Sequence, residues 1–191
     1  RERKLDVAPR RIEDILVTLD DPRALTATEL DALLQRCSVA NMAIYTSNTA
    51  GDTDKEIPRR LGLQLGLVHL DSHWLTDDDA ISPISVRGAE ERGERKEFIP
   101  YTDKPIRWHT DGYYHPPQRR IQAMILHCVR AAASGGENLL MDHELAYIAV
   151  RDTDPRWAGA LMAGDAMCVP ARRGEAGVER DAQTGPVFSV D

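Results

Sequence analysis

Cysteine is scarce in this sequence. Its three cysteines, Cys37, Cys128 and Cys168, lie far apart, and none belongs to a C-x-x-C pair. An odd number of scattered cysteines argues against a disulfide scaffold and against a structural zinc site. We therefore expect a reducing compartment, the cytoplasm.

Long apolar runs and an excess of positive charge are also missing. No apolar stretch approaches the roughly 20 residues that a membrane-spanning helix needs, and no signal-type apolar segment follows the basic start RERKLDVAPRR. With 24 basic and 31 acidic residues the net charge is −7, so no global field draws the chain to nucleic acid or to an acidic membrane. We expect neither as a partner.

The remaining composition is that of an ordinary globular protein. Of the 191 residues, 42% are hydrophobic and 29% are charged, which suits one sizeable core and gives no reason to expect two. We therefore predict a single domain over residues 1–191. The chain does not begin with methionine, which suggests an excerpt of a longer protein. The sequence leaves the oligomeric state open, a homo-oligomer included.

Helix signals occur where capping residues precede apolar residues at helical spacing. Thr26 and Glu29 have the spacing of a capping box at the start of TATELDALLQRC. Pro58 suits the first turn of a second helix, and Asp142 and Asp154 are placed to cap two more. These patterns predict helices that pack outside a sheet-rich core.

Apolar runs of strand length separate these helices. We predict strands within residues 41–48, 80–86, 97–102, 120–132 and 186–190. The run over 120–132 is nearly all apolar in its middle, which is typical of a strand buried on both faces. The glycine-rich, charged tail that precedes the last run predicts a loop. Together these elements indicate a mixed α/β, β-rich domain.

The stretch RWHTDGYYH, residues 107–115, concentrates residue types that bind metals. On an extended strand, side chains two residues apart point to the same side, so His109 and Asp111 would present an imidazole and a carboxylate together. These are two of the three ligands in the facial triad of non-heme Fe(II) oxygenases. Because H-x-D alone is a weak pattern, the surrounding sequence decides how it is interpreted.

The surrounding sequence resembles one family. WHTDGYY, the apolar run IQAMILHCV, the turn SGGEN and the helix in DHELAYIAV resemble, in order and spacing, the taurine dioxygenase-like (clavaminate synthase-like) family of Fe(II)- and 2-oxoglutarate-dependent oxygenases. The resemblance spans roughly residues 30–170. It implies that His109 and Asp111 are catalytic ligands of Fe(II), and that the core is a double-stranded β-helix, or jelly roll, with flanking helices.

The resemblance also implies a cosubstrate-binding residue. The family usually ends a G-G-x-T turn with a threonine that helps to bind 2-oxoglutarate. This sequence has Gly135, Gly136, Glu137 and Asn138 there, and an asparagine amide can donate to a carboxylate much as a hydroxyl can. Asn138 is therefore the candidate cofactor-binding residue. The alternative is a glycine turn that ends in a turn-favouring asparagine.

Two residues that the family uses have no counterpart in the 191 residues. The family's second iron histidine and its 2-oxoglutarate-binding arginine lie beyond the strand that PVFSV resembles. No histidine follows His143, and Arg172, Arg173 and Arg180 precede that strand. The jelly roll also needs about eight strands, and we count five or six. The sequence therefore looks like the front part of such an enzyme, without its C-terminal part.

The resemblance implies an enzyme that uses Fe(II), 2-oxoglutarate and O2 to oxidise, in the simplest case to hydroxylate, a small organic substrate with release of succinate and CO2. Two alternatives stay open. A zinc-dependent hydrolase would activate water with His109, Asp111 and His115, although His115 lies roughly 20 Å from His109 if the strand is extended. A scaffold that has lost its metal would have no chemistry and would serve as a binding module.

Structural roles explain the neighbouring aromatic and histidine residues. Trp108 alternates to the side opposite His109 and is expected to pack, whereas Tyr113 shares the ligand side and could line a substrate pocket. We expect His115 at the rim of that pocket or on the surface. His127, within an apolar run, is predicted to be a hydrogen-bonded core histidine. None of these residues identifies the substrate.

Overall fold

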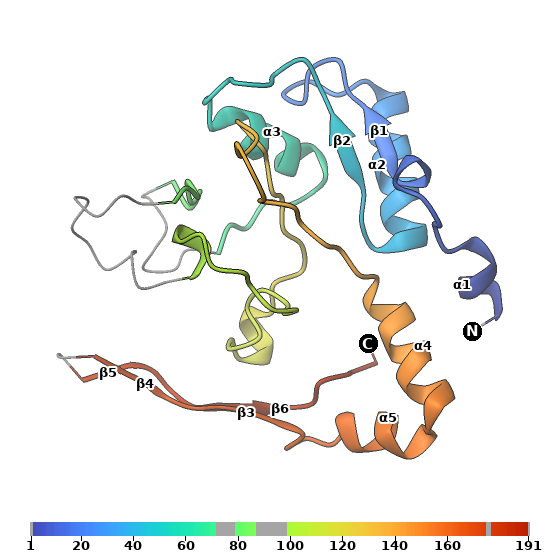
Figure 1. Cartoon of the computed structure of the whole chain (residues 1–191), viewed down its shortest axis with the longest axis vertical. Helices are drawn as coiled ribbons and strands as arrows, with labels where there is room; N and C mark the ends of the chain where they lie inside the picture. Colours follow the sequence, from blue (N-terminus) through green and yellow to red (C-terminus); the bar gives the residue numbers. More distant parts are fainter. Residues whose placement is uncertain (1, 72–78, 87–98, 175–176, 191) are drawn as a thin grey trace. The chain divides into compact units, whose positions relative to one another are not determined.

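Figure 1 shows the computed structural model of the protein, which describes residues 2–71, 79–86, 99–174 and 177–190. The chain forms two compact units. We call Leu67–Met124 the inserted unit, and Arg1–Gly66 together with Ile125–Asp191 the main unit. The single domain over residues 1–191 stays a prediction.

Short helices and strands make up the main unit, and short helices occur in the inserted unit. The described elements of the main unit are α1 (Glu2–Val7), η1 (Ile12–Asp14), β1 (Leu16–Thr18), α2 (Ala27–Ala40), β2 (Ile44–Thr46), α3 (Glu56–Gln64), α4 (His143–Thr153), α5 (Pro155–Leu161), β3 (Met167–Val169), β4 (Arg172–Gly174), β5 (Gly177–Arg180) and β6 (Gln183–Gly185). Those of the inserted unit are two 3-10 helices, η3 (Ile99–Tyr101) and η4 (Pro117–Arg119).

A β–α–β arrangement begins the main unit. β1 and β2 pair in parallel, with Leu16 opposite Ile44 and Thr18 opposite Thr46. Helix α2 forms the connection, because parallel strands cannot be joined by a tight turn. The strand predicted within residues 41–48 is thereby confirmed as β2. Strand β1 was not predicted, since a run of three residues is too short to show a period.

The apolar core of the main unit forms where this strand pair meets α2 and α3. Val17 and Leu19 from the β1 segment, Leu33 from α2 and Leu61 from α3 are buried against one another. The half-buried Ile125 packs against the same cluster. Burial of one such side chain contributes about 1.5–3 kcal/mol, so these contacts fix both helices on the strand pair.

The capping box predicted at the start of α2 is confirmed. The Thr26 hydroxyl accepts a hydrogen bond from the Glu29 amide at 3.3 Å, and the Glu29 carboxylate accepts one from the Thr26 amide at 2.7 Å. At the other end, Asn41 adopts the left-handed conformation with φ of 58° and donates from its backbone to the Cys37 carbonyl. Both ends of α2 thus satisfy backbone groups that the helix itself leaves unpaired.

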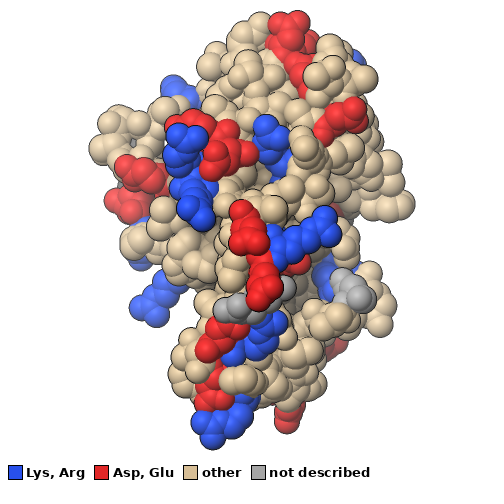
Figure 2. Space-filling view, turned by 90° about the vertical axis from the view of Figure 1, so that its right-hand side faces the viewer, with Lys and Arg blue, Asp and Glu red and all other residues tan. Residues whose placement is uncertain are grey.

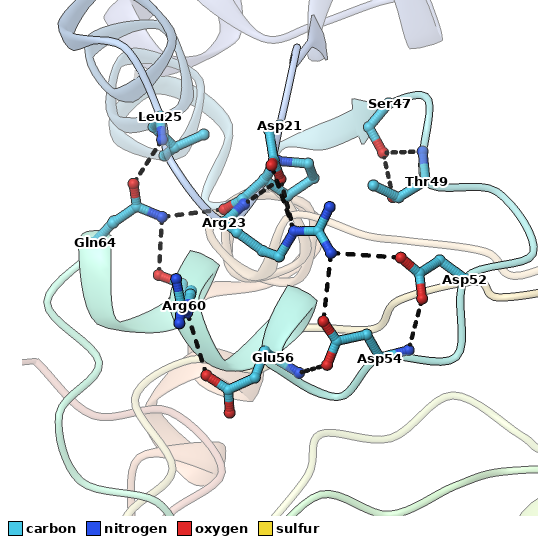
Figure 3. Close-up of polar contacts among 11 residues, drawn as sticks. Asp21, Arg23, Leu25, Ser47, Thr49, Asp52, Asp54, Glu56, Arg60 and Gln64 are labelled. Atoms are coloured by element: carbon cyan, nitrogen blue, oxygen red, sulfur yellow. Dashed lines mark hydrogen bonds and ion pairs between the residues drawn. The ribbon is translucent and has the colours of Figure 1, made fainter.

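Figure 3 shows how Arg23 ties the loop before α2 to the loop before α3. Its Nε lies 3.0 Å from Oδ1 of Asp21, two residues away. Its Nη1 lies 3.4 Å from Oδ2 of Asp52 and 3.3 Å from Oδ2 of Asp54. One guanidinium therefore offsets three carboxylates that would otherwise repel one another.

Helix α3 is confirmed with Pro58 in its first turn. Its last residue, Gln64, also holds the loop before α2. The Gln64 side-chain oxygen accepts from the Leu25 amide at 2.6 Å, and its side-chain nitrogen donates to the Pro22 carbonyl at 3.0 Å. These bonds satisfy backbone groups of a loop that has no ladder partner.

The two later helices begin where their caps predict. The Asp142 carboxylate accepts from the Glu144 amide at the start of α4, and the Asp154 carboxylate accepts from the Arg156 amide at the start of α5. Helix α5 ends at Leu161, short of the glycine at 164. The local capping chemistry was therefore a sufficient guide to where these helices begin.

A polar network links α1 to the start of α4. Lys4 Nζ lies 2.6 Å from Asp142 Oδ2, contacts the Glu144 carboxylate, and donates to the Val39 carbonyl at 2.7 Å. The Asn41 side chain donates to the other oxygen of Asp142 at 2.9 Å. In this network each charged group has a partner of opposite sign.

Figure 2 shows that acidic and basic side chains also lie next to one another on the face of the molecule that it draws.

The tail before residue 186 was wrongly predicted to be a loop. It contains three strands: β4 pairs with β5, and β6 pairs with β3, which precedes the tail; both pairs are antiparallel. The strand predicted over 186–190 is also wrong, because those residues form no strand and the last strand is β6. Arginine, glycine and glutamine are weak strand formers, but pairing between adjacent strands needs only backbone groups.

Three other strand predictions also fail in the described residues. Residues 80–86 form no strand, and 99–101 form η3, whereas 97 and 98 lie outside the described residues. Residues 120–132 form no strand and are not buried on both faces, since half-buried and exposed positions alternate from 125 to 130. An apolar run becomes a central strand only where a neighbour pairs with it on each side.

The jelly roll that the resemblance implies therefore stays a prediction. The strands of the described residues form three separate two-stranded sheets. A double-stranded β-helix needs larger sheets packed face to face. The coarser expectation of a chain that mixes helices and strands agrees with the described elements.

Candidate functional site

The H-x-D segment lies in the inserted unit, where it is not a strand. Residues 109 and 110 have no regular secondary structure, and 111–114 form a turn. The turn is closed by a hydrogen bond of 2.8 Å from the His115 amide to the Gly112 carbonyl. The strand alternation used to predict the site therefore does not apply, since no residue of the motif is in a strand and Asp111 itself belongs to the turn.

The two predicted ligands nevertheless face each other. His109 Nε2 lies 3.8 Å from Asp111 Oδ1, and their side chains are 45% and 48% exposed. This separation is too long for a hydrogen bond between them. Both atoms therefore keep the lone pairs that a metal ion would need. Two first-row metal–ligand bonds of about 2.1 Å can join donors up to about 4.2 Å apart, so one ion can reach both atoms.

The backbone sets the tautomer of His109. Its Nδ1 lies 2.8 Å from the Arg107 carbonyl oxygen. Because a carbonyl only accepts, Nδ1 carries the proton in this contact, and the lone pair of the neutral ring is on Nε2. Metal-binding histidines are commonly oriented by such a bond from the second ring nitrogen. The Nε2 lone pair thus lies on the side of the ring that faces Asp111.

Gly112 is tightly enclosed directly after Asp111. Its φ is +68°, and a Cβ at this position would lie 2.3 Å from Cγ1 of Ile121 and 3.0 Å from Cδ2 of His115. A positive φ and this lack of space both require glycine. The Ile121 and His115 side chains therefore both crowd the side of Gly112 where a Cβ would point.

His115 is paired with Asp71. His115 Nε2 lies 3.1 Å from Asp71 Oδ2, and only 8% of the His115 side chain is exposed. Arg119 Nη2 lies 2.6 Å from the other carboxylate oxygen. Burial would raise the pKa of Asp71, but the hydrogen bonds from Arg119 and His115 outweigh it and hold the pKa below its usual value.

The structure corrects two expectations for this segment. His115 is not on the surface, because its side chain is almost fully covered. Trp108 does not pack, since 60% of it is exposed. Tyr113 is exposed, and its ring contacts Tyr114 edge to face, with centroids 5.2 Å apart; a place in a substrate pocket stays a prediction. Sequence reasoning missed Asp71, which lies 44 residues before His115 in a loop and shows no periodic signal.

His109 Nε2 and Asp111 Oδ1 lie close enough for one metal ion to bind both. An imidazole nitrogen with a carboxylate oxygen is a donor set that suits Fe(II). No group of three histidine, cysteine, aspartate or glutamate side chains gathers around one point among the described residues. His115 therefore does not complete the zinc site considered as an alternative.

Asn138 lies in the main unit, after a turn that agrees with the glycine motif. Gly135 and Gly136 have φ of +66° and +79°, and the Asn138 side chain is exposed. Its Nδ2 donates to the Gly136 carbonyl at 3.3 Å, a long hydrogen bond. The side-chain amide is therefore accessible to a ligand. Its role in binding 2-oxoglutarate stays a prediction.

The hydrogen bond predicted for His127 is confirmed, but the residue is half-buried and lies outside any strand. His127 Nδ1 lies 2.6 Å from the Tyr45 hydroxyl, and the two rings are stacked with centroids 6.0 Å apart. Burial lowers the pKa of His127, which a charge interaction with Asp52 only partly offsets. Burial also raises the pKa of Tyr45 to about 12. Both groups are therefore neutral at pH 7.

The family of the chain follows from a comparison with family sequences. The family described as taurine catabolism dioxygenase TauD, TfdA family, matches residues 13–190, nearly the whole sequence. The chain belongs to the TauD/TfdA family of dioxygenases. The match confirms the resemblance and places both H-x-D and the glycine turn within the family region.

One curated relative carries an activity in its name. A uridine-5'-phosphate dioxygenase from an Amycolatopsis species is 39% identical over 84 residues, which are 44% of this chain and 29% of that protein. The matched part thus covers less than a third of the relative's length. No solved structure matches the chain. None of the described helices is both long enough and apolar enough to span a bilayer.

Proposed function

We propose that this TauD/TfdA chain carries part of the active site of an Fe(II)- and 2-oxoglutarate-dependent dioxygenase. It would hydroxylate, or oxidise in a related way, a small organic molecule with O2, releasing succinate and CO2. One observation carries the proposal: the Nε2 of His109 faces the carboxylate of Asp111, within reach of one ion, in the motif where the family match applies.

His109 and Asp111 are the proposed metal ligands and catalytic residues. The Arg107 carbonyl holds the proton on Nδ1 of His109 and so leaves Nε2 free to bind. Asp111 adds a negative charge that favours a divalent cation. Bound Fe(II) with 2-oxoglutarate would supply the oxidising chemistry that protein side chains lack. The protein would orient the substrate C–H bond and limit access of water.

Asn138 is the proposed contact to 2-oxoglutarate. Its amide is exposed and makes only one long bond to its own turn. A free amide N–H can donate to a carboxylate of the cosubstrate. The glycines before it keep the turn free of side chains that would obstruct this approach.

The proposed substrate class is a phosphorylated nucleoside or a compound related to it. This follows from the name of the relative that is 39% identical over 84 residues. Uridine-5'-phosphate is therefore the first substrate to test, and unphosphorylated uridine is the comparison that tests whether the phosphate matters.

The test is a coupled measurement of succinate and oxidised product in the complete gene product that contains these residues. With Fe(II), 2-oxoglutarate, O2 and uridine-5'-phosphate, we expect both products in the wild type. We expect His109→Ala and Asp111→Ala to form neither, because each removes a metal ligand.

His69→Ala is the matched control, since His69 is an exposed histidine of the same unit outside the motif. We expect it to retain wild-type activity. Normal succinate formation in either ligand variant would refute the assignment. Succinate without an oxidised nucleotide would keep the chemistry and reject the substrate class.

A further inference from the structure

A pair of contacts controls the position of the backbone next to Asp111. The Ile121 and His115 side chains both crowd Gly112, the next residue, at the position where a Cβ would lie. The hydrogen bond from the His115 amide to the Gly112 carbonyl, 2.8 Å long, closes the same turn. Any shift of His115 would therefore be passed to Gly112 and to Asp111, its neighbour along the chain.

Asp71 determines where the His115 ring lies. Its Oδ2 accepts from His115 Nε2 at 3.1 Å, and the ring is almost fully covered. A carboxylate only accepts, so Nε2 carries a proton in this contact and is not available to a metal. His115 thus acts as a spacer between Asp71 and the ligand turn.

Arg119 fixes the orientation of Asp71 in turn. It donates to Oδ1 at 2.6 Å, so the two carboxylate oxygens are held from two directions. Both donors come from the segment just after the turn, whereas Asp71 comes from a loop far earlier in the sequence. The carboxylate therefore ties residues 115 and 119 to one point outside their own segment.

We propose that Asp71 is a positioning residue for the metal site: it holds Asp111 facing His109 through His115 and Gly112, without touching the metal. The proposal rests on the proposed function, because it assumes that His109 and Asp111 bind the ion. It adds a residue outside the H-x-D motif. Groups that orient metal ligands typically change metal affinity by about 10- to 100-fold when they are removed.

The test is a titration of the complete gene product with Mn(II), a redox-stable probe for a site of nitrogen and oxygen ligands. Calorimetry at about 0.15 M salt, where distant charges are largely screened, gives the dissociation constant without turnover. We expect Asp71→Ala to weaken Mn(II) binding by about tenfold or more. We also expect faster hydrogen exchange at the His115 amide, because its turn is no longer held.

Asp103→Ala is the matched control, because it removes the same charge from an exposed site of the same unit. We expect its affinity for Mn(II) to stay within about twofold of the wild type. Equal affinities of wild type and Asp71→Ala would overturn the positioning role, and so would an equal loss in Asp103→Ala, which would indicate a general charge effect.

Two other results would count against the proposed function itself. A wild type that binds no Mn(II), or His109→Ala that binds Mn(II) as tightly as the wild type, would reject the metal site and the positioning role with it.

If circular dichroism shows that Asp71→Ala does not fold, the Mn(II) affinity of Arg119→Ala tests the positioning role instead. Its side chain is 53% exposed, so its removal leaves no cavity. A severalfold weaker affinity then supports the proposal, and an unchanged one overturns it.

Discussion

The hydroxyl of Tyr45 lies 2.6 Å from Nδ1 of His127, and the two rings stack nearly in parallel. This pair joins β2 to the irregular segment that contains Ile125, one of the residues that pack on the main core. Burial raises the pKa of Tyr45 to about 12. Burial therefore favours the neutral phenol over the phenolate.

Tyr45 should ionise about two pH units later than an ordinary tyrosine. Its folded pKa, about 12, exceeds the usual 10.0. The resulting stability is present below pH 10 and is lost as pH rises towards 12, because only the unfolded state ionises in that range. Phenolate absorbance, compared between wild type and Tyr45→Phe, isolates this group. A difference curve centred near pH 10 would contradict the buried contact.

The network around Lys4 should make the protein sensitive to acid. Burial would raise the pKa of Asp142, but hydrogen bonds from Lys4 and Asn41 hold it below 3.8. The hydrogen bond from Lys4 is the main reason that the pKa of Glu144 lies below 4.5. A lowered carboxyl pKa stabilises the fold above the unfolded value, and the stability is lost as pH falls through the folded value.

We therefore expect the free energy of unfolding to decrease as pH falls below 4.5 and on through 3.8. Denaturant titrations of wild type and Lys4→Met at several pH values measure this. The free energy of unfolding should change less with pH in Lys4→Met than in the wild type. The control Lys104→Met removes an exposed lysine of the inserted unit and should keep the wild-type slope of free energy against pH. Identical slopes in all three proteins would rule the network out as the cause.

Two leucines of α3 should differ sharply in their contribution to stability. Leu61 is 2% exposed within the core cluster, whereas Leu63 is 51% exposed. Leu61→Ala should cost about 2–5 kcal/mol, because it removes buried methyl groups and leaves a cavity. Leu63→Ala should change stability by less than about 0.5 kcal/mol. Chemical denaturation measures both, and similar losses would mean that α3 presents another face to the core.

Gly112 should not tolerate alanine. A Cβ there would lie 2.3 Å from Cγ1 of Ile121, and the backbone has a positive φ. We expect Gly112→Ala to lose about 1–3 kcal/mol of stability and to bind Mn(II) more weakly, because the turn after Asp111 must move. Adding Ile121→Ala removes the closest atom and should recover part of the affinity. A double variant no better than Gly112→Ala would show that the strain lies in the backbone alone.

Local chemistry in the sequence predicted local structure well. The starts of α2, α4 and α5 follow from Thr26, Asp142 and Asp154, because a cap needs only a side chain and the amides two or three residues along. Strands were predicted poorly, since each depends on a partner that its own residues do not specify. The apolar run over 120–132 lacks such a neighbour among the described residues.

In the candidate site too, contacts between residues close in sequence were predicted and a contact between distant residues was not. His109 and Asp111 were found because they are close in sequence and belong to a motif, and their side chains do face each other. The reason given for this was wrong, since the motif forms no strand and Asp111 is part of a turn. Asp71 could not be predicted, because its contact with His115 crosses 44 residues and follows no spacing rule.

The most direct measurement of the central claim is an anaerobic spectrum of the complete gene product with Fe(II) and 2-oxoglutarate. The account predicts a weak visible absorption band that appears only when both are present, that is retained in His69→Ala, and that is absent from His109→Ala and Asp111→Ala. A wild type without such a band, or a band of equal strength in the two ligand variants, would contradict it.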